Sequence, residues 1–286
     1  MKKYLLITAI LFFLLGCILV YQSITYNDKK LHVVICDVGQ GDAIFIRTPS
    51  GSDILIDGGP DGSVLACLGK HMPFWDRTLE IMILTHPHAD HLTGLIDVSK
   101  SYSVLSFGTE KIVNPTSSYK ELIKQLEQGH TKQRFLLQGD KFTIKDGVSL
   151  RTLWPTHEWV DQNSVGGGNA DENGLSIIQM LSYGNFEALF TGDAQASDIE
   201  KIESMLSAID FLKVPHHGSK TGLSAEILGI LNPKIAAISV GKNNKYGHPT
   251  AFILDLLKSK NIKILRTDEI EDIEIISDGK SFSAKN

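Results

Sequence analysis

The chain begins with a long apolar run that is followed by much shorter ones. After Met1-Lys2-Lys3, the residues from Tyr4 to Tyr21 are apolar except for Thr8. At about 1.5 Å per residue, a helix over this run approaches the roughly 30 Å thickness of a bilayer core. Because the two lysines precede the run, we expect them in the cytoplasm and the rest of the chain outside. The pattern predicts an uncleaved membrane anchor, so that the protein is a single-pass membrane protein with its main domain extracellular.

Two other interpretations of the same run remain open. Leu14-Leu15-Gly16-Cys17 resembles a lipoprotein cleavage site, which would make Cys17 a lipid attachment point. Leu15 is larger than the residue usual there, and Ile18-Leu19-Val20 is apolar where a lipoprotein normally turns polar. A cleaved signal peptide normally has a shorter apolar core and an Ala-X-Ala site, and this segment contains no Ala-X-Ala.

Three segments follow from this pattern. Residues 1–22 form the predicted anchor, residues 23–30 a short polar linker, and residues 31–286 one domain. Short apolar runs separated by tight turns predict strands in the first part of the domain, and strand–loop–helix units fill the second part. The first three strands, predicted as an antiparallel meander, are Leu31–Ile35, Ile44–Arg47 and Ile54–Ile56. Later predicted strands include Leu79–Leu84, Lys111–Val113, Leu175–Leu181, Phe186–Phe190, Ile209–Val214, Lys234–Val240 and Ile270–Ile276; predicted helices include Gly62–Lys70, Leu92–Val98, Tyr119–Gln128, Asp198–Ser207, Ala225–Leu231 and Ala251–Lys260.

Four of the predicted strands end in loops rich in metal-binding side chains. The densest loop is Thr85-His86-Pro87-His88-Ala89-Asp90-His91, with three imidazoles and a carboxylate within six residues. The other loops contain Asp193, His216–His217 and His248. Neutral imidazole and carboxylate are the ligands that Zn²⁺ and similar metals prefer. One site that receives all four loops accounts for the pattern.

Composition narrows the classes of protein that remain. The 286 residues are 42% hydrophobic and 21% charged, as expected of a globular chain with a sizeable core. The net charge of −5 argues against a dominating positive field for nucleic acid, although local contacts remain open. The three cysteines, Cys17, Cys36 and Cys67, lack a metal-type spacing and predict small apolar residues or a lone thiol, without a disulfide framework.

The motifs together resemble a known family. His86-X-His88-X-Asp90-His91, with Leu-Ile-Asp57-Gly-Gly before it and Thr-Gly-Asp193 after it, resembles the metallo-β-lactamase superfamily. Further motifs, over about residues 31–276, resemble the extracytoplasmic hydrolase domain of ComEC-type competence proteins and their free-standing relatives. These motifs are Asp37-Val-Gly-Gln-Gly-Asp42-Ala, Asn173-X-X-Ser176, Leu-Phe-Thr-Gly-Asp193-Ala, Leu-Lys-Val-Pro-His216-His217-Gly-Ser and Tyr246-Gly-His248-Pro.

The resemblance implies an α/β (α+β) fold, the αββα sandwich, with a site for two divalent metals at one edge. By this resemblance His86 and His88 bind the first metal, Asp90 and His91 bind the second, and Asp193 bridges them. His217 completes the second metal, with its neighbour His216 as the alternative ligand. Asn173 stands near the place where the superfamily usually has a third histidine on the first metal. Asparagine binds a borderline metal less well than imidazole does, so this departure leaves three alternatives: a weaker first site, a first site that prefers manganese, or a water in place of the third ligand. Zinc is the expected metal and manganese the alternative.

Other residues are candidates for supporting roles. Asp57 is expected to orient a ligand histidine, and Asp42 either does the same or caps a turn. His248 is placed like an acid or an oxyanion donor, or else it is a turn residue packed on Tyr246. Asp90 is positioned to orient the attacking water. Ser219, Lys242 and Lys245 are candidate phosphate contacts, or else ordinary solvated loop residues.

The expected function is hydrolysis through a metal-bridging water, most simply of a phosphodiester, as in a phosphodiesterase or nuclease acting outside the cytoplasmic membrane. The expected substrate is a phosphoester, with DNA as a candidate. The expected partner is the membrane, which the protein contacts through its anchor. An alternative is that the same site opens a lactone or β-lactam ring or removes choline phosphate from a wall polymer. A further alternative is a non-catalytic, metal-containing module that docks DNA to a partner.

Overall fold

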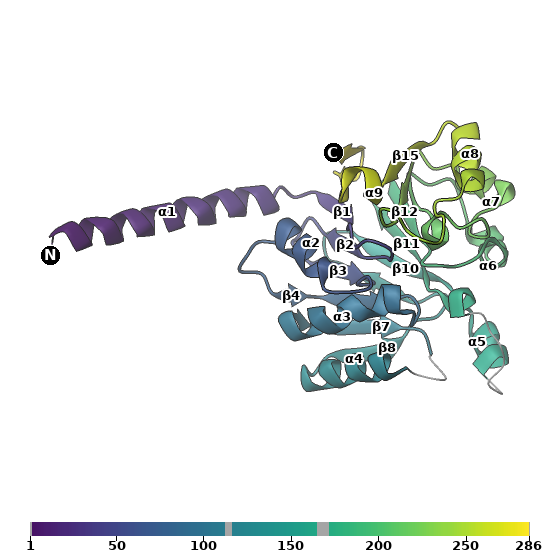
Figure 1. Cartoon of the computed structure of the whole chain (residues 1–286), viewed down its shortest axis with the longest axis horizontal. Coiled ribbons are helices and arrows are strands. Elements are labelled where there is room, and N and C mark those ends of the chain that lie inside the picture. Colours follow the sequence, from purple (N-terminus) through teal and green to yellow (C-terminus); the bar gives the residue numbers. More distant parts are fainter. Residues whose placement is uncertain (1, 112–115, 165–171, 286) are drawn as a thin grey trace.

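A single long helix projects from the rest of the molecule. The computed structural model describes residues 2–111, 116–164 and 172–285. Helix α1 (Lys2–Tyr26) has no buried residue and is long and apolar enough to cross a membrane. It leaves the domain on one side and carries the N-terminus far from it (Figure 1). The helix includes Ser23–Tyr26, so the polar connection to the domain is shorter than the predicted linker.

Two sheets form the middle of the domain. One sheet has the order β17-β16-β1-β2-β3-β5-β7-β8 and the other has the order β15-β14-β13-β12-β11-β10-β9. The strands of the first sheet are β1 (Leu31–Ile35), β2 (Ile44–Arg47), β3 (Asp53–Ile56), β5 (Ile81–Leu84), β7 (Ser106–Thr109), β8 (Lys132–Phe135), β16 (Ile273–Ser277) and β17 (Phe282–Lys285). Those of the second are β9 (Lys141–Thr143), β10 (Ser149–Trp154), β11 (Ile178–Tyr183), β12 (Phe186–Phe190), β13 (Phe211–Lys213), β14 (Ile235–Ile238) and β15 (Lys263–Arg266). Two further short strands, β4 (Thr78–Leu79) and β6 (Ser103–Val104), pair with each other.

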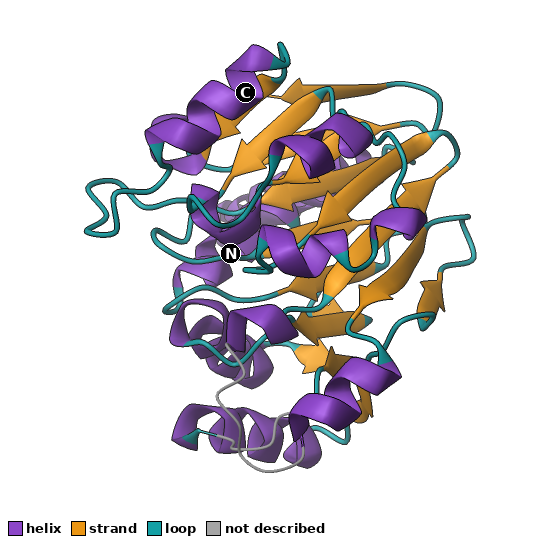
Figure 2. Ribbon diagram, turned by 90° about the vertical axis from the view of Figure 1, so that its right-hand side faces the viewer, coloured by secondary structure: helices purple, strands orange, loops and turns teal. Residues whose placement is uncertain are grey.

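Helices cover the outer faces of both sheets (Figures 1 and 2). The helices packed with the first sheet are α2 (Ser63–His71), α3 (Ala89–Ser101) and α4 (Ser117–Gln128); those packed with the second include α6 (Ala196–Glu200), α7 (Ala225–Leu231) and α8 (Ala251–Ser259). Shorter helices are α5 (His157–Ser164), α9 (Thr267–Ile270), η1 (Glu172–Leu175), η2 (Glu203–Met205) and η3 (Pro215–Gly218).

Strand β5 is continuously apolar because both of its faces are buried. In β5, Ile81 and Ile83 face the core between the sheets, whereas Met82 and Leu84 pack under the helices of the first sheet. Successive side chains of a strand point to opposite faces, so a strand between two layers needs apolar residues at every position. These layers are the predicted αββα sandwich, which the structure confirms.

Several predicted elements differ in their limits. The predicted strand Leu79–Leu84 divides at Glu80 into β4 and β5, because the Glu80 amide donates to Asp53 and its carboxylate accepts from the Asp53 amide. The predicted helix over residues 198–207 is broken into α6 and η2, and the strand expected from Leu175 begins at Ile178. Helices α5 and α9 and strand β17 were not predicted. Residues 112–113 of the predicted strand Lys111–Val113 lie outside the described residues.

The prediction that the chain has no disulfide is wrong. Cys36, at the end of β1, is bonded to Cys67 in α2, with 5.8 Å between the Cα atoms. Both side chains are buried, and they lie 31 residues apart in the sequence, a spacing that carries no recognisable pattern. Cys17, on α1, is exposed and unbonded.

Breaking the Cys36–Cys67 bond should lower the free energy of unfolding of the domain. Closing a loop of this length stabilises a fold by about 3–4 kcal/mol, mainly by restricting the unfolded chain. We expect reduction of the disulfide to lower the free energy of unfolding by this amount, as measured by urea unfolding of the full chain in detergent. Cys17→Ser is the control and should behave as the unchanged protein does, and equal stability of oxidised and reduced protein would contradict the assignment.

Candidate metal centre

Four potential ligands from three distant parts of the chain meet at one edge of the sandwich. Asp90 and His91 lie in the first turn of α3, Asp193 follows β12, and His217 lies in η3 after β13. One ligand atom from each lies within 4.8 Å of the others. His91 Nε2 is 3.4 Å from Asp193 Oδ1, and His217 Nε2 is 3.5 Å from both Asp193 Oδ2 and Asp90 Oδ2. The two oxygens of Asp193 therefore face two different histidines.

His86 and His88 lie beside this group, directly after β5. The centroid of the His86 ring is 4.6 Å from that of His88 and 4.2 Å from that of His91. His86 is fully buried, and His88 is partly exposed. The close approach of α3 to the loop after β3 depends on glycine, because a Cβ at Gly94 would overlap the carbonyl oxygen of Gly58.

Asp57 and Thr85 orient two of the rings. His91 Nδ1 lies 2.8 Å from Asp57 Oδ2, and Thr85 Oγ1 donates to the same carboxylate oxygen at 2.7 Å. Since the Thr85 proton points to Asp57, the hydroxyl oxygen accepts from His86 Nδ1, 3.1 Å away. Both rings thus have Nδ1 as the donor and Nε2 directed inward, the arrangement of metal-binding histidines. Both Nε2 atoms are buried and have no hydrogen-bond partner among the described residues.

His217 is oriented in the same way by a different set of groups. Its Nδ1 donates to the Ser239 carbonyl oxygen at 3.0 Å and lies 3.4 Å from Asp42 Oδ1, and its buried Nε2 has no hydrogen-bond partner in the part of the chain that is described. Asp42 forms an ion pair with Lys213, a fully buried lysine that also donates to the Gly192 carbonyl oxygen at 3.3 Å. Burial raises the pKa of Asp42, but the charges of Lys213 and His217 outweigh it and lower this pKa to about 2. Asp42 therefore stays ionised beside His217.

The charges of the group attract cations. Burial lowers the pKa of His91 and of His217, yet Asp193 and the other neighbouring carboxylates raise both values well above the usual one. Burial, together with the charge of His91, holds the pKa of His86 well below its usual value. Burial alone would raise the pKa of Asp90, but the approach of its Oδ2 to His217 Nε2 at 3.5 Å and the charge of His91 lower it to about 2. A divalent ion at this site would displace protons from His91 and His217.

The backbone of η3 separates the roles of two neighbouring histidines. His216 and His217 have φ angles of 50° and 53°, in the left-handed region that non-glycine residues rarely adopt. Strained backbone of this kind is typical of functional sites. It directs His217 into the buried group, while His216, partly exposed, has its Nε2 3.6 Å from Asp193 Oδ2. His216 thus lies at the rim, on the side of His248.

The rim contains the remaining predicted residues. The His248 ring is 5.8 Å from that of His216 and is stacked on Tyr246 at 6.0 Å. Burial and the charges of His216 and His217 lower the pKa of His248, so its ring is neutral near pH 7. Lys242 and Lys245 are exposed on the same loop as His248.

Two other predicted residues lie in turns beside the group. Ser219 is half-buried, and its hydroxyl lies 3.3 Å from that of Thr221. Asn173 lies in η1, three residues before Ser176, whose hydroxyl accepts from the Asp193 amide at 3.1 Å. Asn173 therefore belongs to the segment that supports the Asp193 backbone.

Sequence reasoning missed some of the supporting residues. A lysine within the apolar strand β13 was a signal that Lys213 has a buried partner. The hydroxyls of Thr85 and Ser176 and the carbonyl of Ser239 left no such signal, because only the fold brings them to the ligands.

Comparison with known proteins agrees with this geometry. The "Beta-lactamase superfamily domain" matches residues 52–221. The chain belongs to the metallo-β-lactamase superfamily. Members of this superfamily are generally hydrolytic and bind divalent metal ions, typically two. The metallo-β-lactamase fold protein YhfI from Bacillus subtilis superposes with a TM-score of 0.58 at 12% identity, covering 87% of this chain and all of YhfI, which shows the shared fold.

Competence proteins are among its relatives. ComE operon protein 3 of Bacillus subtilis is 31% identical over 257 residues, which are 83% of this chain and 32% of that protein. Competence protein ComA of Neisseria gonorrhoeae is 26% identical over 87% of this chain and 32% of ComA. The chain thus spans about a third of the length of these two relatives.

Replacing Asp57 by asparagine should weaken metal binding without unfolding the metallo-β-lactamase domain. The single oxygen of an amide cannot replace both carboxylate oxygens, one of which accepts from the Thr85 amide and the other from the Thr85 hydroxyl and His91 Nδ1. The amide nitrogen therefore faces one of these donors, and the His91 ring is held less firmly. Loss of such a partner typically lowers metal affinity about 10- to 100-fold, which competition with a chelator would measure. Asp61→Asn, on an exposed carboxylate four residues away, is the matched control. Equal affinity in the two variants would exclude an orienting role for Asp57.

Proposed function

We propose that this metallo-β-lactamase-fold protein is a metal-dependent phosphodiesterase or nuclease that acts outside the cytoplasmic membrane. The observation that carries the proposal is the convergence of the buried Nε2 atoms of His91 and His217 on the carboxylates of Asp90 and Asp193, with the buried ring of His86 beside them. Once an ion displaces the protons of His91 and His217, this set of neutral nitrogens and ionised oxygens fits borderline divalent ions, zinc first and manganese second.

The residues divide into two ligand sets that share Asp193. His86 and His88, with Asn173 as a further donor, would hold one ion, and Asp90, His91 and His217 would hold the other. When bound, a pair of such ions makes a water nucleophilic at neutral pH and stabilises charge on the oxygens of the scissile bond. Asp90, ionised and partly exposed, orients that water. His248, neutral at the rim, donates a hydrogen bond from its ring N–H to the leaving oxygen and stabilises the charge that develops there.

Cationic and hydroxyl groups at the rim favour a phosphoester over an uncharged ester. Lys242 and Lys245 project from the loop of His248, and Ser219 follows the ligand segment of His217. Amines and hydroxyls next to a metal are the usual phosphate contacts in proteins. Together they supply local positive charge on a chain whose net charge is −5. The competence proteins among the relatives also favour DNA as the substrate.

The extracytoplasmic location rests on two independent features. Helix α1 begins with Lys2 and Lys3, ahead of its apolar run, which favours its insertion with the domain outside. The buried Cys36–Cys67 disulfide is typical of proteins that fold in an oxidising compartment. Lipid attachment at the exposed Cys17 is the alternative mode of anchoring.

Hydrolysis by the full chain in detergent tests the proposal. With Zn²⁺ or Mn²⁺ we expect cleavage of a chromogenic phosphodiester and of single-stranded DNA, and a loss on the order of 100-fold for Asp193→Ala. Asp97→Ala, on an exposed carboxylate of α3, is the control and should retain full activity.

The same assay distinguishes the alternatives. Turnover of lactones, β-lactams or choline-phosphate esters instead of phosphodiesters would replace the proposed substrate class. Bound metal without turnover of any of these compounds would favour a binding module and overturn the hydrolase.

A further inference from the structure

The loop between α2 and β4 carries an exposed aromatic pair next to the end of α1. Phe74 is 47% exposed and Trp75 46% exposed, and their ring centroids are 5.1 Å apart. The Phe74 amide donates to Gln22 Oε1 at 2.9 Å. Gln22 directly follows the apolar run that ends at Tyr21. The aromatic pair is thus tied to the position at which α1 changes from apolar to polar.

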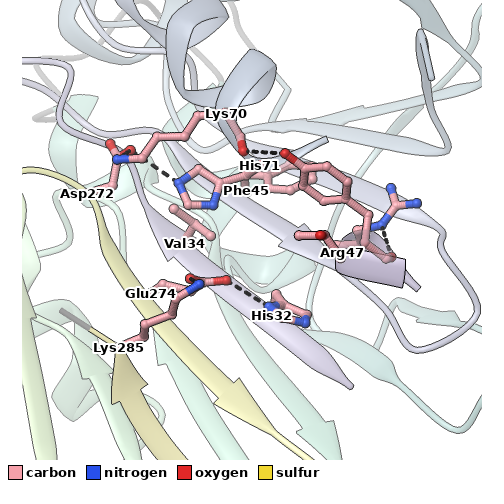
Figure 3. Close-up of a pocket in the computed structure, with 11 residues that line it drawn as sticks. His32, Val34, Phe45, Arg47, Lys70, His71, Asp272, Glu274 and Lys285 are labelled. Carbon is pink, nitrogen blue, oxygen red and sulfur yellow. Dashed lines mark hydrogen bonds and ion pairs between the residues drawn. The ribbon is translucent and has the colours of Figure 1, made fainter. Parts of the chain in front are cut away.

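Two more contacts attach the end of α1 to the domain. The Tyr26 hydroxyl donates to the Lys70 carbonyl oxygen at 2.8 Å, and Arg47 Nε donates to the Tyr26 carbonyl oxygen at 3.2 Å. Arg47 is itself held by Asp53 at 2.6 Å. These residues border a cavity of about 280 Å³ beneath the end of the helix, in which Lys70 is paired with Asp272 (Figure 3). The aromatic loop and α1 are therefore held in a fixed relation.

A bilayer around α1 would reach the aromatic pair. The apolar run of α1 matches the hydrocarbon core, and the headgroup region beyond that core is about 5–7 Å thick on each side. Tryptophan and other aromatic rings are favoured at this depth, where part of the ring is apolar and part is hydrated. We propose that Phe74 and Trp75 insert into the headgroup region of the bilayer that α1 spans, as a second membrane contact.

This contact would set the orientation of the metal centre. The C-terminal end of α3 adjoins the aromatic loop, because the Ser103 amide donates to the Arg77 carbonyl oxygen at 2.7 Å and Arg77 donates to the Tyr102 hydroxyl at 2.9 Å. The ligands Asp90 and His91 lie at the opposite end of this helix, which is about 20 Å long. In Figure 1, β4 lies on the side of the domain from which α1 leaves. The centre thus faces away from the bilayer, toward dissolved substrates.

Fluorescence quenching by brominated lipids tests the contact in the full chain reconstituted into phosphatidylcholine vesicles. The Trp75 signal is the difference between the unchanged protein and Trp75→Phe, which retains Trp154 and Trp159. We expect bromines near the headgroup end of the acyl chains to reduce this signal by about half or more, and bromines near the chain ends to reduce it less. As a matched control, Phe252→Trp in the Trp75→Phe background places an equally exposed tryptophan on α8, which should not be quenched.

The proposal rests on the membrane insertion of α1 but not on the hydrolytic activity, which is assayed on the same vesicles. Unquenched Trp75 in protein that floats with the vesicles would overturn the second contact while leaving the anchor intact. Unquenched Trp75 that is also shielded from acrylamide would indicate a protein partner in place of lipid. Failure of the protein to float would overturn the anchor and this contact together, whatever the activity.

Discussion

The buried carboxylate of Asp57 connects the parts of the chain on which the metal centre depends. It accepts from the Thr85 amide and hydroxyl after β5 and from His91 Nδ1 in α3. Burial raises the pKa of this carboxyl, and the charge and hydrogen bond of His91 oppose that rise. A carboxylate at such depth is tolerated only when its oxygens accept hydrogen bonds. The packing of β3, β5 and α3 that supplies these donors therefore also fixes the orientation of the ligands. As a result, two imidazole Nε2 atoms point inward.

The second sheet supplies the other half of the centre by the same principle. Lys213 is buried in β13, where its charge is compensated by Asp42 from the loop between β1 and β2 of the first sheet. Asp42 in turn faces His217. This ion pair joins the two sheets next to the ligands. Breaking a buried pair by removing one partner leaves an uncompensated charge, so the pair favours one relative position of the sheets at the site. Charges that are paired across the sandwich thus hold the residues of the centre in place, while the apolar core between the sheets stabilises the fold.

Much of this arrangement could be predicted from the sequence, and the exceptions have physical reasons. The strands leading to His86, Asp193 and His216 are largely apolar, and polar clusters at their ends indicated a shared edge. The Cys36–Cys67 disulfide was not predicted, because a pairing across 31 residues depends on how β1 meets α2. The ion pair of Lys213 could not be predicted for the same reason, because its partner Asp42 lies 171 residues away. The position of Phe74 and Trp75 next to the end of α1 could not be predicted either, because it depends on the contact with Gln22. The local sequence pattern predicts which side chains can bind a metal or carry a charge, but tertiary contacts decide which partner each of them has.

We infer that the ligands of the loop His86–His91 are divided between two ions that share Asp193. Elemental analysis of the dialysed full chain, beside its His88→Ala variant, tests this division most directly. We expect two divalent ions in the unchanged protein. We expect the loss of one of them in His88→Ala, because Asp90, His91, Asp193 and His217 would still hold the other. A single ion in the unchanged protein, or a variant that keeps both, would contradict this division.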